Sequence, residues 1–180
     1  MPGLPDSVLD STPVYPDAGH LGDALRARGL MFACAESCTG GLLAAAMTSI
    51  PGSSMWFDRG FVTYSNDAKV TLLRVNPETL DRFGAVSEET ALEMAAGVLQ
   101  AAPRADFAIS TTGIAGPDGG TAGKPVGMVC FGFARRTGDG VVTRADTQVF
   151  KGDREQVRNA SVGFALSRAL DVLGVQTSES

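Results

Sequence analysis

Histidine is almost missing from this chain of 180 residues, in which His20 is the single one. A Ser-His-Asp triad, a Cys-His pair and a histidine metal site would each have to use that residue. Because His20 stands in the leading segment, we expect none of these arrangements. We also expect no metal ion and no cofactor.

Cysteine is scarce too, with Cys34, Cys38 and Cys130 as the complete set. An odd number of cysteines, two of them in one apolar segment, does not indicate a disulfide framework. The spacing of Cys34 and Cys38 matches no familiar zinc pattern.

Long apolar runs and an excess of basic residues are also absent. No run of about 18 apolar residues occurs, and the N-terminus lacks a basic-then-apolar signal pattern, so we expect a cytoplasmic protein without membrane contact. Fifteen basic against twenty acidic residues give a net charge of −5, which argues against a broad nucleic-acid surface but leaves a local basic pocket open. With 44% hydrophobic and 19% charged residues, the chain has the composition of a folded globular protein.

The chain divides into a leader and one domain. Residues 1–18 contain four of the nine prolines and are expected to be flexible, and residues 19–175 are expected to form a single domain. Helices are predicted at residues 21–28, 42–47, 66–73 and 77–83, after Ser87, and after a capping box formed by Asp153 and Gln156. Strands are predicted at residues 30–34, 56–64, 105–111, 126–134 and 141–150.

Strands and helices alternate first, and a hairpin and a long helix follow. This order predicts the α/β class, as a three-layer α/β/α sandwich with a mixed, mostly parallel sheet.

The segment at residues 33–41 places small hydroxyl residues and two glycines between a buried strand and a helix. Backbone N–H groups and the helix dipole favour negative charge at such a junction. Two interpretations of Ser37 therefore stand: a nucleophile beside anion-stabilising donors, or an N-cap. Cys38 is the rival nucleophile, because a thiolate at a helix start would be chemically capable.

A serine nucleophile needs a base, and the shortage of histidine leaves lysine or tyrosine. Tyr64 and Lys69 lie where a strand ends and a helix starts. The helix dipole and partial burial would lower the pKa of Lys69 toward the neutral amine that a base requires. The alternative is a solvated surface lysine and a core tyrosine.

The glycine-rich loop at residues 113–120 and Arg154 have two interpretations each. Glycines let backbone N–H groups approach a phosphate or an oxyanion, but they also make ordinary turns. Arg154 could clamp a phosphate or could be a solvated helix-start residue. If the strands before Ser37, Tyr64 and residues 112–113 are parallel neighbours, these positions converge at one edge of the sheet, where α/β proteins bind ligands.

Several long motifs occur in one order along the chain: AESCTGG at 35–41, PGSS at 51–54, GFVTYSN at 60–66, GAVS at 84–87, GIAGPDGG at 113–120 and KPVG at 124–127. Together they resemble the CinA C-terminal family, and the similarity runs from about residue 20 to 173. Members of that family carry this domain either behind a large N-terminal domain or alone, and this chain resembles the stand-alone form.

The resemblance implies an amidase that converts nicotinamide mononucleotide to nicotinic acid mononucleotide and ammonia. It places the family's serine on Ser37, its tyrosine on Tyr64 and its lysine on Lys69. The expected substrate contacts are Thr39, Gly40, Asn66, Thr112, Gly113, Ala115, Gly116 and Arg154. The expected partners are a small-molecule nucleotide and further copies of the chain in a homo-oligomer. The alternatives are a nucleotide-binding module without turnover and an amidase that acts on another nucleotide.

Overall fold

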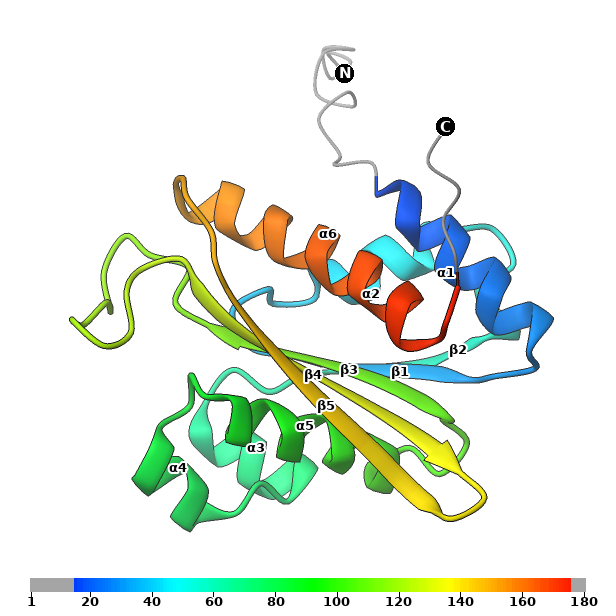
Figure 1. The fold of residues 1–180 in the computed structure, drawn as a ribbon, viewed down its shortest axis with the longest axis horizontal. Coiled ribbons are helices and arrows are strands. Elements are labelled where there is room, and N and C mark those ends of the chain that lie inside the picture. Colours follow the sequence, from blue (N-terminus) through cyan, green and yellow to red (C-terminus); the bar gives the residue numbers. More distant parts are fainter. Residues whose placement is uncertain (1–14, 176–180) are drawn as a thin grey trace, which may run out of the picture.

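The structure is a computed structural model that describes residues 15–175. Five strands form one sheet in the order β2-β1-β3-β4-β5 (Figure 1). Their bounds are Phe32–Glu36 for β1, Phe57–Val62 for β2, Phe107–Gly113 for β3, Met128–Thr137 for β4 and Gly140–Val149 for β5. β1 lies parallel to both β2 and β3, whereas β4 lies antiparallel to β3 and β5. The predicted mixed sheet is confirmed: β4 alone of the five runs against the common direction, so two of the four neighbouring pairs are antiparallel.

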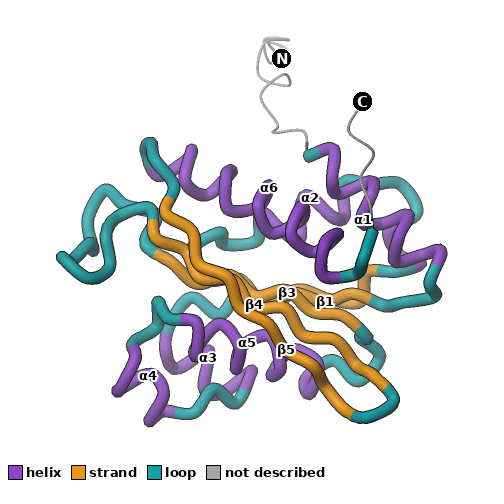
Figure 2. The backbone as a smooth tube through the Cα atoms, in the orientation of Figure 1, coloured by secondary structure: helices purple, strands orange, loops and turns teal. Residues whose placement is uncertain are grey.

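Helices cover both faces of this sheet, as Figures 1 and 2 show. One face carries α1 (Pro16–Ala27), α2 (Leu42–Thr48) and α6 (Arg154–Val172). The other face carries α3 (Asn66–Leu73), α4 (Pro77–Phe83) and α5 (Glu88–Ala101). A short 3-10 helix, η2 (Ser53–Met55), leads into β2. The three-layer α/β/α sandwich predicted from the sequence is therefore confirmed.

The two faces of β1 bury different clusters, because successive side chains of a strand point to opposite faces. Phe32 and Cys34 belong to the cluster beneath α1, α2 and α6. Ala33 and Ala35 belong to the cluster beneath α3, α4 and α5. Since every residue of β1 is buried, this inner strand is an unbroken apolar run up to Glu36.

The first helix begins earlier than predicted. Pro16 occupies the first turn of α1, where its fixed φ and missing N–H are tolerated, and Ala18 is buried in the core. Residues 16–18 thus belong to the folded part rather than to the predicted leader, and residues 1–14 lie outside the described residues. The predicted caps are confirmed, with Ser65 and Ser87 accepting from backbone N–H groups and Asp153 forming its capping box.

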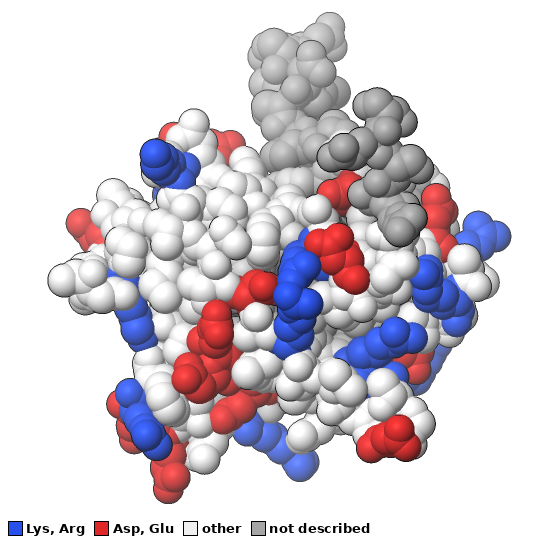
Figure 3. Space-filling view, viewed as in Figure 1, with Lys and Arg blue, Asp and Glu red and all other residues white. Residues whose placement is uncertain are grey.

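None of the helices within residues 15–175 is both long enough and apolar enough to cross a membrane. On the face shown in Figure 3, basic and acidic side chains are interspersed over the surface.

Candidate active site

The carboxyl ends of β1, β2 and β3 meet at one edge of the sheet. Glu36, the last residue of β1, pairs with Val62 of β2 on one side and with Thr111 of β3 on the other. The segments that follow these three strands are therefore neighbours, as the parallel arrangement predicted. Ser37 stands directly after β1, at the centre of this edge.

The turn from Ser37 into α2 needs its two glycines. Gly40 has φ 58° and Gly41 has φ 103°, in the left-handed region that favours glycine. Gly41 is the N-cap of α2 and provides no side-chain cap. Ser37 is thus not the N-cap of this helix, which removes one of the two interpretations of its hydroxyl.

Glu36 occupies the N-terminus of α2, and the sequence did not suggest this role. Its carboxylate is 1% exposed and accepts from the backbone N–H groups of Gly41 at 3.0 Å, Leu43 at 3.0 Å and Ala44 at 2.9 Å. The donors at which we expected an anionic substrate group are therefore already paired within the chain. The one signal in the sequence is a carboxylate at the end of an otherwise apolar strand.

Ser37 and Lys69 form a buried pair. Lys69 Nζ lies 3.2 Å from Ser37 Oγ and also donates to the carbonyls of Thr63 at 2.9 Å and Tyr64 at 3.3 Å. Ser37 is 9% exposed and Lys69 is 1% exposed. Burial lowers the pKa of the Lys69 ammonium below its ordinary value of 10.5, and no carboxylate in the described chain lies within 4 Å to hold the charge. Lys69 is therefore not the solvated surface lysine of the alternative interpretation.

Cys38 is poorly suited to be the nucleophile. Its side chain is buried, and this burial raises the pKa of the thiol to about 12. A thiol with such a pKa stays protonated near neutral pH, whereas the attacking species must be the thiolate.

Tyr64, the other candidate base, is not the core tyrosine of the alternative interpretation. Its side chain is 60% exposed, and its hydroxyl accepts from Arg154 Nη2 at 3.0 Å. Arg154 also donates through Nη1 to the carbonyl of Gly116 at 2.9 Å. Tyr64 contacts Lys69 through its backbone carbonyl only, so its hydroxyl and Arg154 form the rim between β2 and the glycine-rich loop.

The predicted substrate contacts separate into buried and accessible groups. Thr39 is 0% exposed with its hydroxyl 2.7 Å from that of Thr111, and Thr112 is 1% exposed and donates to the carbonyl of Ala85. The hydroxyls of these two threonines are therefore paired within the chain rather than directed at a ligand.

The remaining predicted contacts follow the same division. Ala115 and Gly116 are buried, whereas Gly40 and Asn66 are exposed. A Cβ atom on Gly113 would lie 2.6 Å from Val129 Cγ2, so the packing of β3 against β4 requires glycine there.

Arg158 is a second residue that the sequence did not suggest. It donates through Nε to the carbonyl of Cys38 at 3.2 Å and through Nη2 to the carbonyl of Thr39 at 3.0 Å. A sequence signal does exist, because Arg154 and Arg158 are four residues apart and lie on one face of α6.

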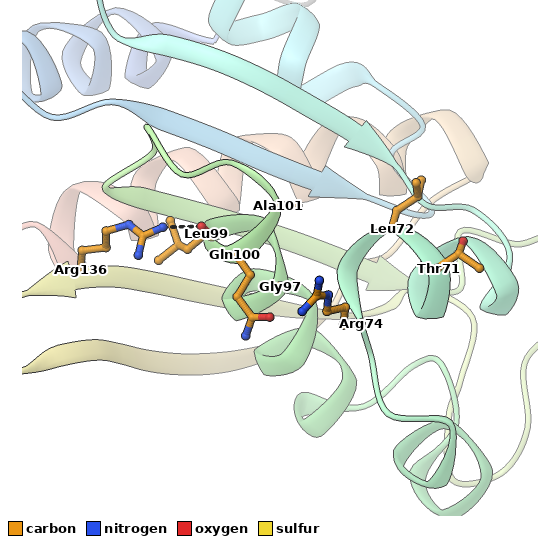
Figure 4. A pocket seen from close by; sticks show the side chains of 8 residues that line it. All are labelled: Thr71, Leu72, Arg74, Gly97, Leu99, Gln100, Ala101 and Arg136. Carbon is orange, nitrogen blue, oxygen red and sulfur yellow. Dashed lines mark hydrogen bonds between the residues drawn. The ribbon is translucent and has the colours of Figure 1, made fainter.

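A groove of about 480 Å³ lies apart from these residues, between α3 and the end of α5 (Figure 4). Its lining includes Arg74, Gln100 and Arg136 but no serine, cysteine or lysine, and the hydroxyl of Thr71 donates to the carbonyl of Asp67. Arg136 donates hydrogen bonds to the backbone carbonyls of Leu99 and Ala105, at and just after the C-terminal end of α5. The chemistry therefore points to the edge at Ser37 and not to this groove.

Within the described part of the chain, no group of three or more His, Cys, Asp or Glu side chains is arranged to hold a metal ion.

Known proteins are similar to this chain over almost its whole length. Residues 16–173 match the family described as the CinA C-terminal domain. The nicotinamide-nucleotide amidohydrolase PncC of Enterobacter agglomerans is 60% identical over 151 residues, which are 84% of this chain and 90% of that protein. The protein of the same name from Escherichia coli K12 is 54% identical over 147 residues, 82% of this chain and 87% of that one.

A solved structure agrees with the fold. The crystal structure of a competence or damage-inducible protein from Enterobacter asburiae superposes with a TM-score of 0.83 at 39% identity, covering 91% of this chain and 99% of that one.

Proposed function

The chain is a hydrolase of the CinA C-terminal domain family, and we propose that it converts nicotinamide mononucleotide to nicotinic acid mononucleotide and ammonia. The observation that carries the proposal is the buried contact of 3.2 Å between Ser37 Oγ and Lys69 Nζ. A serine beside a buried amine is a nucleophile beside a base, which is what amide hydrolysis requires when no histidine is at hand. The names of the two PncC relatives, nicotinamide-nucleotide amidohydrolases, support a nicotinamide nucleotide as the substrate.

In the first step, Ser37 Oγ attacks the carboxamide carbon and its proton passes to the neutral amine of Lys69. The contact distance allows direct transfer, so the step does not need the hydroxyl of Tyr64. The tetrahedral intermediate collapses when the C–N bond breaks, and the proton on Lys69 goes to the departing ammonia. An acyl-enzyme ester on Ser37 remains.

In the second step, neutral Lys69 removes a proton from water, which attacks the ester carbon. Collapse of this second intermediate breaks the bond to Ser37 Oγ, and Lys69 returns the proton to the serine. The carboxylic acid product loses its remaining proton to solvent and leaves as the carboxylate. The mechanism uses no metal ion and no cofactor.

We assign the accessible groups of the rim to the nucleotide. Arg154 is the cation that faces solvent beside the glycine-rich loop, and a guanidinium suits a phosphate monoester. Tyr64, Gly40 and Asn66 are exposed around the same edge and would contact the sugar or the ring. The side chains of Thr39 and Thr112, together with Gly113, Ala115 and Gly116, are proposed to shape the pocket from below.

A substrate screen tests the proposal. Ammonia release is measured with nicotinamide mononucleotide, its dinucleotide, nicotinamide riboside and nicotinamide, and we expect turnover of the mononucleotide above the others. Turnover of a different amide would reassign the substrate. Binding of the mononucleotide by calorimetry without ammonia release would replace the enzyme with a nucleotide-binding module.

Two expectations about the whole protein stay predictions. A homo-oligomer is tested by light scattering of the purified chain, and a cytoplasmic location by cell fractionation.

A further inference from the structure

Most backbone N–H groups of the turn after β1 are already paired. The N–H of Ser37 donates to the carbonyl of Thr111 at 2.9 Å, and that of Gly40 donates to the carbonyl of Ser37 at 3.1 Å. The first N–H groups of α2 donate to the carboxylate of Glu36, as described above. For the two residues between, Cys38 and Thr39, no oxygen of the described chain accepts from the backbone N–H; the N–H of Cys38 contacts its own sulfur atom, a weak acceptor.

These two donors are costly to leave unpaired. Cys38 is 5% exposed and Thr39 is 0% exposed. A buried N–H without an acceptor destabilises the folded chain, so such groups are rare unless a ligand or water completes them. They directly follow the serine, where acyl-transfer enzymes place the donors that stabilise the oxyanion.

Arg158 determines which way one of these donors points. Its guanidinium holds the carbonyl of Cys38, which belongs to the same planar peptide as the N–H of Thr39. In a trans peptide the C=O and N–H point in opposite directions, so the N–H of Thr39 points away from α6. The face opposite α6 is covered by α3, which carries Lys69 (Figure 1). The donor is thereby directed toward the side on which Lys69 meets Ser37.

The second contact of Arg158 fixes the next peptide as well. Its Nη2 binds the carbonyl of Thr39 at 3.0 Å, and a Cβ atom built on Gly40 would lie 3.4 Å from the same nitrogen. The guanidinium thus lies directly over the turn. A cation on a carbonyl also polarises the peptide, which makes its N–H a stronger donor.

We propose that the backbone N–H groups of Cys38 and Thr39 form the oxyanion hole and that Arg158 is its positioning residue. The inference rests on the proposed amide hydrolysis and adds the group that holds the donors in place. Arg158 acts through the peptide and does not touch the substrate. Its loss therefore weakens transition-state stabilisation and leaves ground-state binding of the nucleotide nearly unchanged.

The experiment compares Arg158→Gln and Arg158→Lys with the wild type in ammonia release from nicotinamide mononucleotide. Arg158→Gln is expected to lower kcat by about 10²-fold with KM within about twofold, the size typical for losing one such donor. Arg158→Lys retains a cation that reaches one carbonyl, so its kcat is expected to lie between that of the wild type and that of Arg158→Gln. Arg168→Gln is the matched control, because Arg168 lies on the same helix and pairs with Asp146 and Asp171 instead.

A second readout does not depend on the natural substrate. A fluorophosphonate probe forms a bond from Ser37 Oγ to phosphorus and releases fluoride, while the serine proton passes to Lys69. The phosphoryl oxygen needs the same donors, so the labelling rate measured by intact mass is expected to fall in the order wild type, Arg158→Lys, Arg158→Gln.

The outcomes separate the two proposals. Labelling in the expected order, but without ammonia release from the mononucleotide by the wild type, would remove the proposed substrate and retain the oxyanion hole. A raised KM with unchanged kcat would make Arg158 a substrate contact and overturn the inference. Equal kcat and equal labelling in all folded variants would overturn it too.

Discussion

Lys69 Nζ lies 3.2 Å from Ser37 Oγ, although the two residues are 32 positions apart and are separated in the chain by α2, η2 and β2. The lysine is buried, its pKa is lowered by desolvation, and its other contacts are the carbonyls of Thr63 and Tyr64. These carbonyls orient the amine without a carboxylate that would keep it charged. The pair is therefore arranged for proton transfer rather than for an ion pair.

Substitution of the nucleophile is the first prediction. Ser37→Ala is expected to lower ammonia release by about 10³-fold or more, because a nucleophile and its base act as one unit. Cys38→Ala is the control and is expected to keep most of the activity, since the pKa of about 12 keeps that thiol protonated. Full activity in a folded Ser37→Ala protein, or its loss in Cys38→Ala alone, would move the nucleophile to the neighbouring residue.

The pH dependence of the reaction follows from Lys69. Because the proposed base is the neutral amine of Lys69, kcat/KM is expected to rise with pH through an apparent pKa below the ordinary 10.5 of lysine. Lys69→Met is expected to abolish this rise and to reduce activity by about 10³-fold or more. The profile is measured from pH 5 to 10, and an ascending limb that survives in Lys69→Met would assign the base to another group.

Stability depends on pH through the same lysine. The folded-state pKa is lowered, so the unfolded chain binds more protons between that pKa and about 10.5. The free energy of unfolding of the wild type relative to Lys69→Met is therefore expected to rise with pH across this window and to level off above it. Urea titrations of both proteins at pH 6, 8 and 10 measure the difference, and a difference that is flat or falls with pH would contradict a lowered pKa.

Glu36→Gln tests the carboxylate at the start of α2. The amide offers one oxygen in place of two and turns an N–H group toward the donors of α2, so we expect a loss of about 2–4 kcal/mol in the free energy of unfolding. Glu89→Gln is the control, because Glu89 is an exposed carboxylate in the first turn of α5. Loss of such a charge at a helix N-terminus typically lowers the free energy of unfolding by about 0.3–1 kcal/mol. Equal losses in the two variants, measured by urea unfolding, would mean that the three hydrogen bonds of Glu36 add nothing.

Tyr64→Phe distinguishes a proton relay from a rim contact. Because the hydroxyl of Tyr64 is bound to Arg154, Tyr64→Phe is expected to keep kcat within about threefold of the wild type and to raise KM. Arg154→Gln is expected to raise KM for the mononucleotide by about 10-fold or more and to change turnover of nicotinamide riboside little, because the riboside lacks the phosphate. A fall in kcat of about 10²-fold in Tyr64→Phe would restore the relay.

The helix caps and the strand before Ser37 could be predicted because they depend on residues close together in the sequence. Ser65, Ser87 and Asp153 cap their helices as predicted, since a capping side chain reaches only two or three residues ahead. The strand before Ser37 follows from an apolar run, and the order of strands and helices predicted the three layers. The boundary at α1 was missed because proline serves both as a leader residue and as the first residue of a helix.

The roles of individual side chains depended on the tertiary structure. The sequence predicted Ser37, Tyr64 and Lys69 as site residues, but the contact of Tyr64 with Arg154 spans 90 positions and that of Arg158 with Cys38 spans 120. Such contacts depend on which strands are neighbours and on their register, and neither is encoded within a turn or a helix. The hydroxyl at position 37 and the scarcity of histidine are properties of the amino-acid sequence by itself. Whether that hydroxyl meets an amine, and which backbone donors remain unpaired beside it, was decided when α3 and α6 packed onto opposite faces of one sheet.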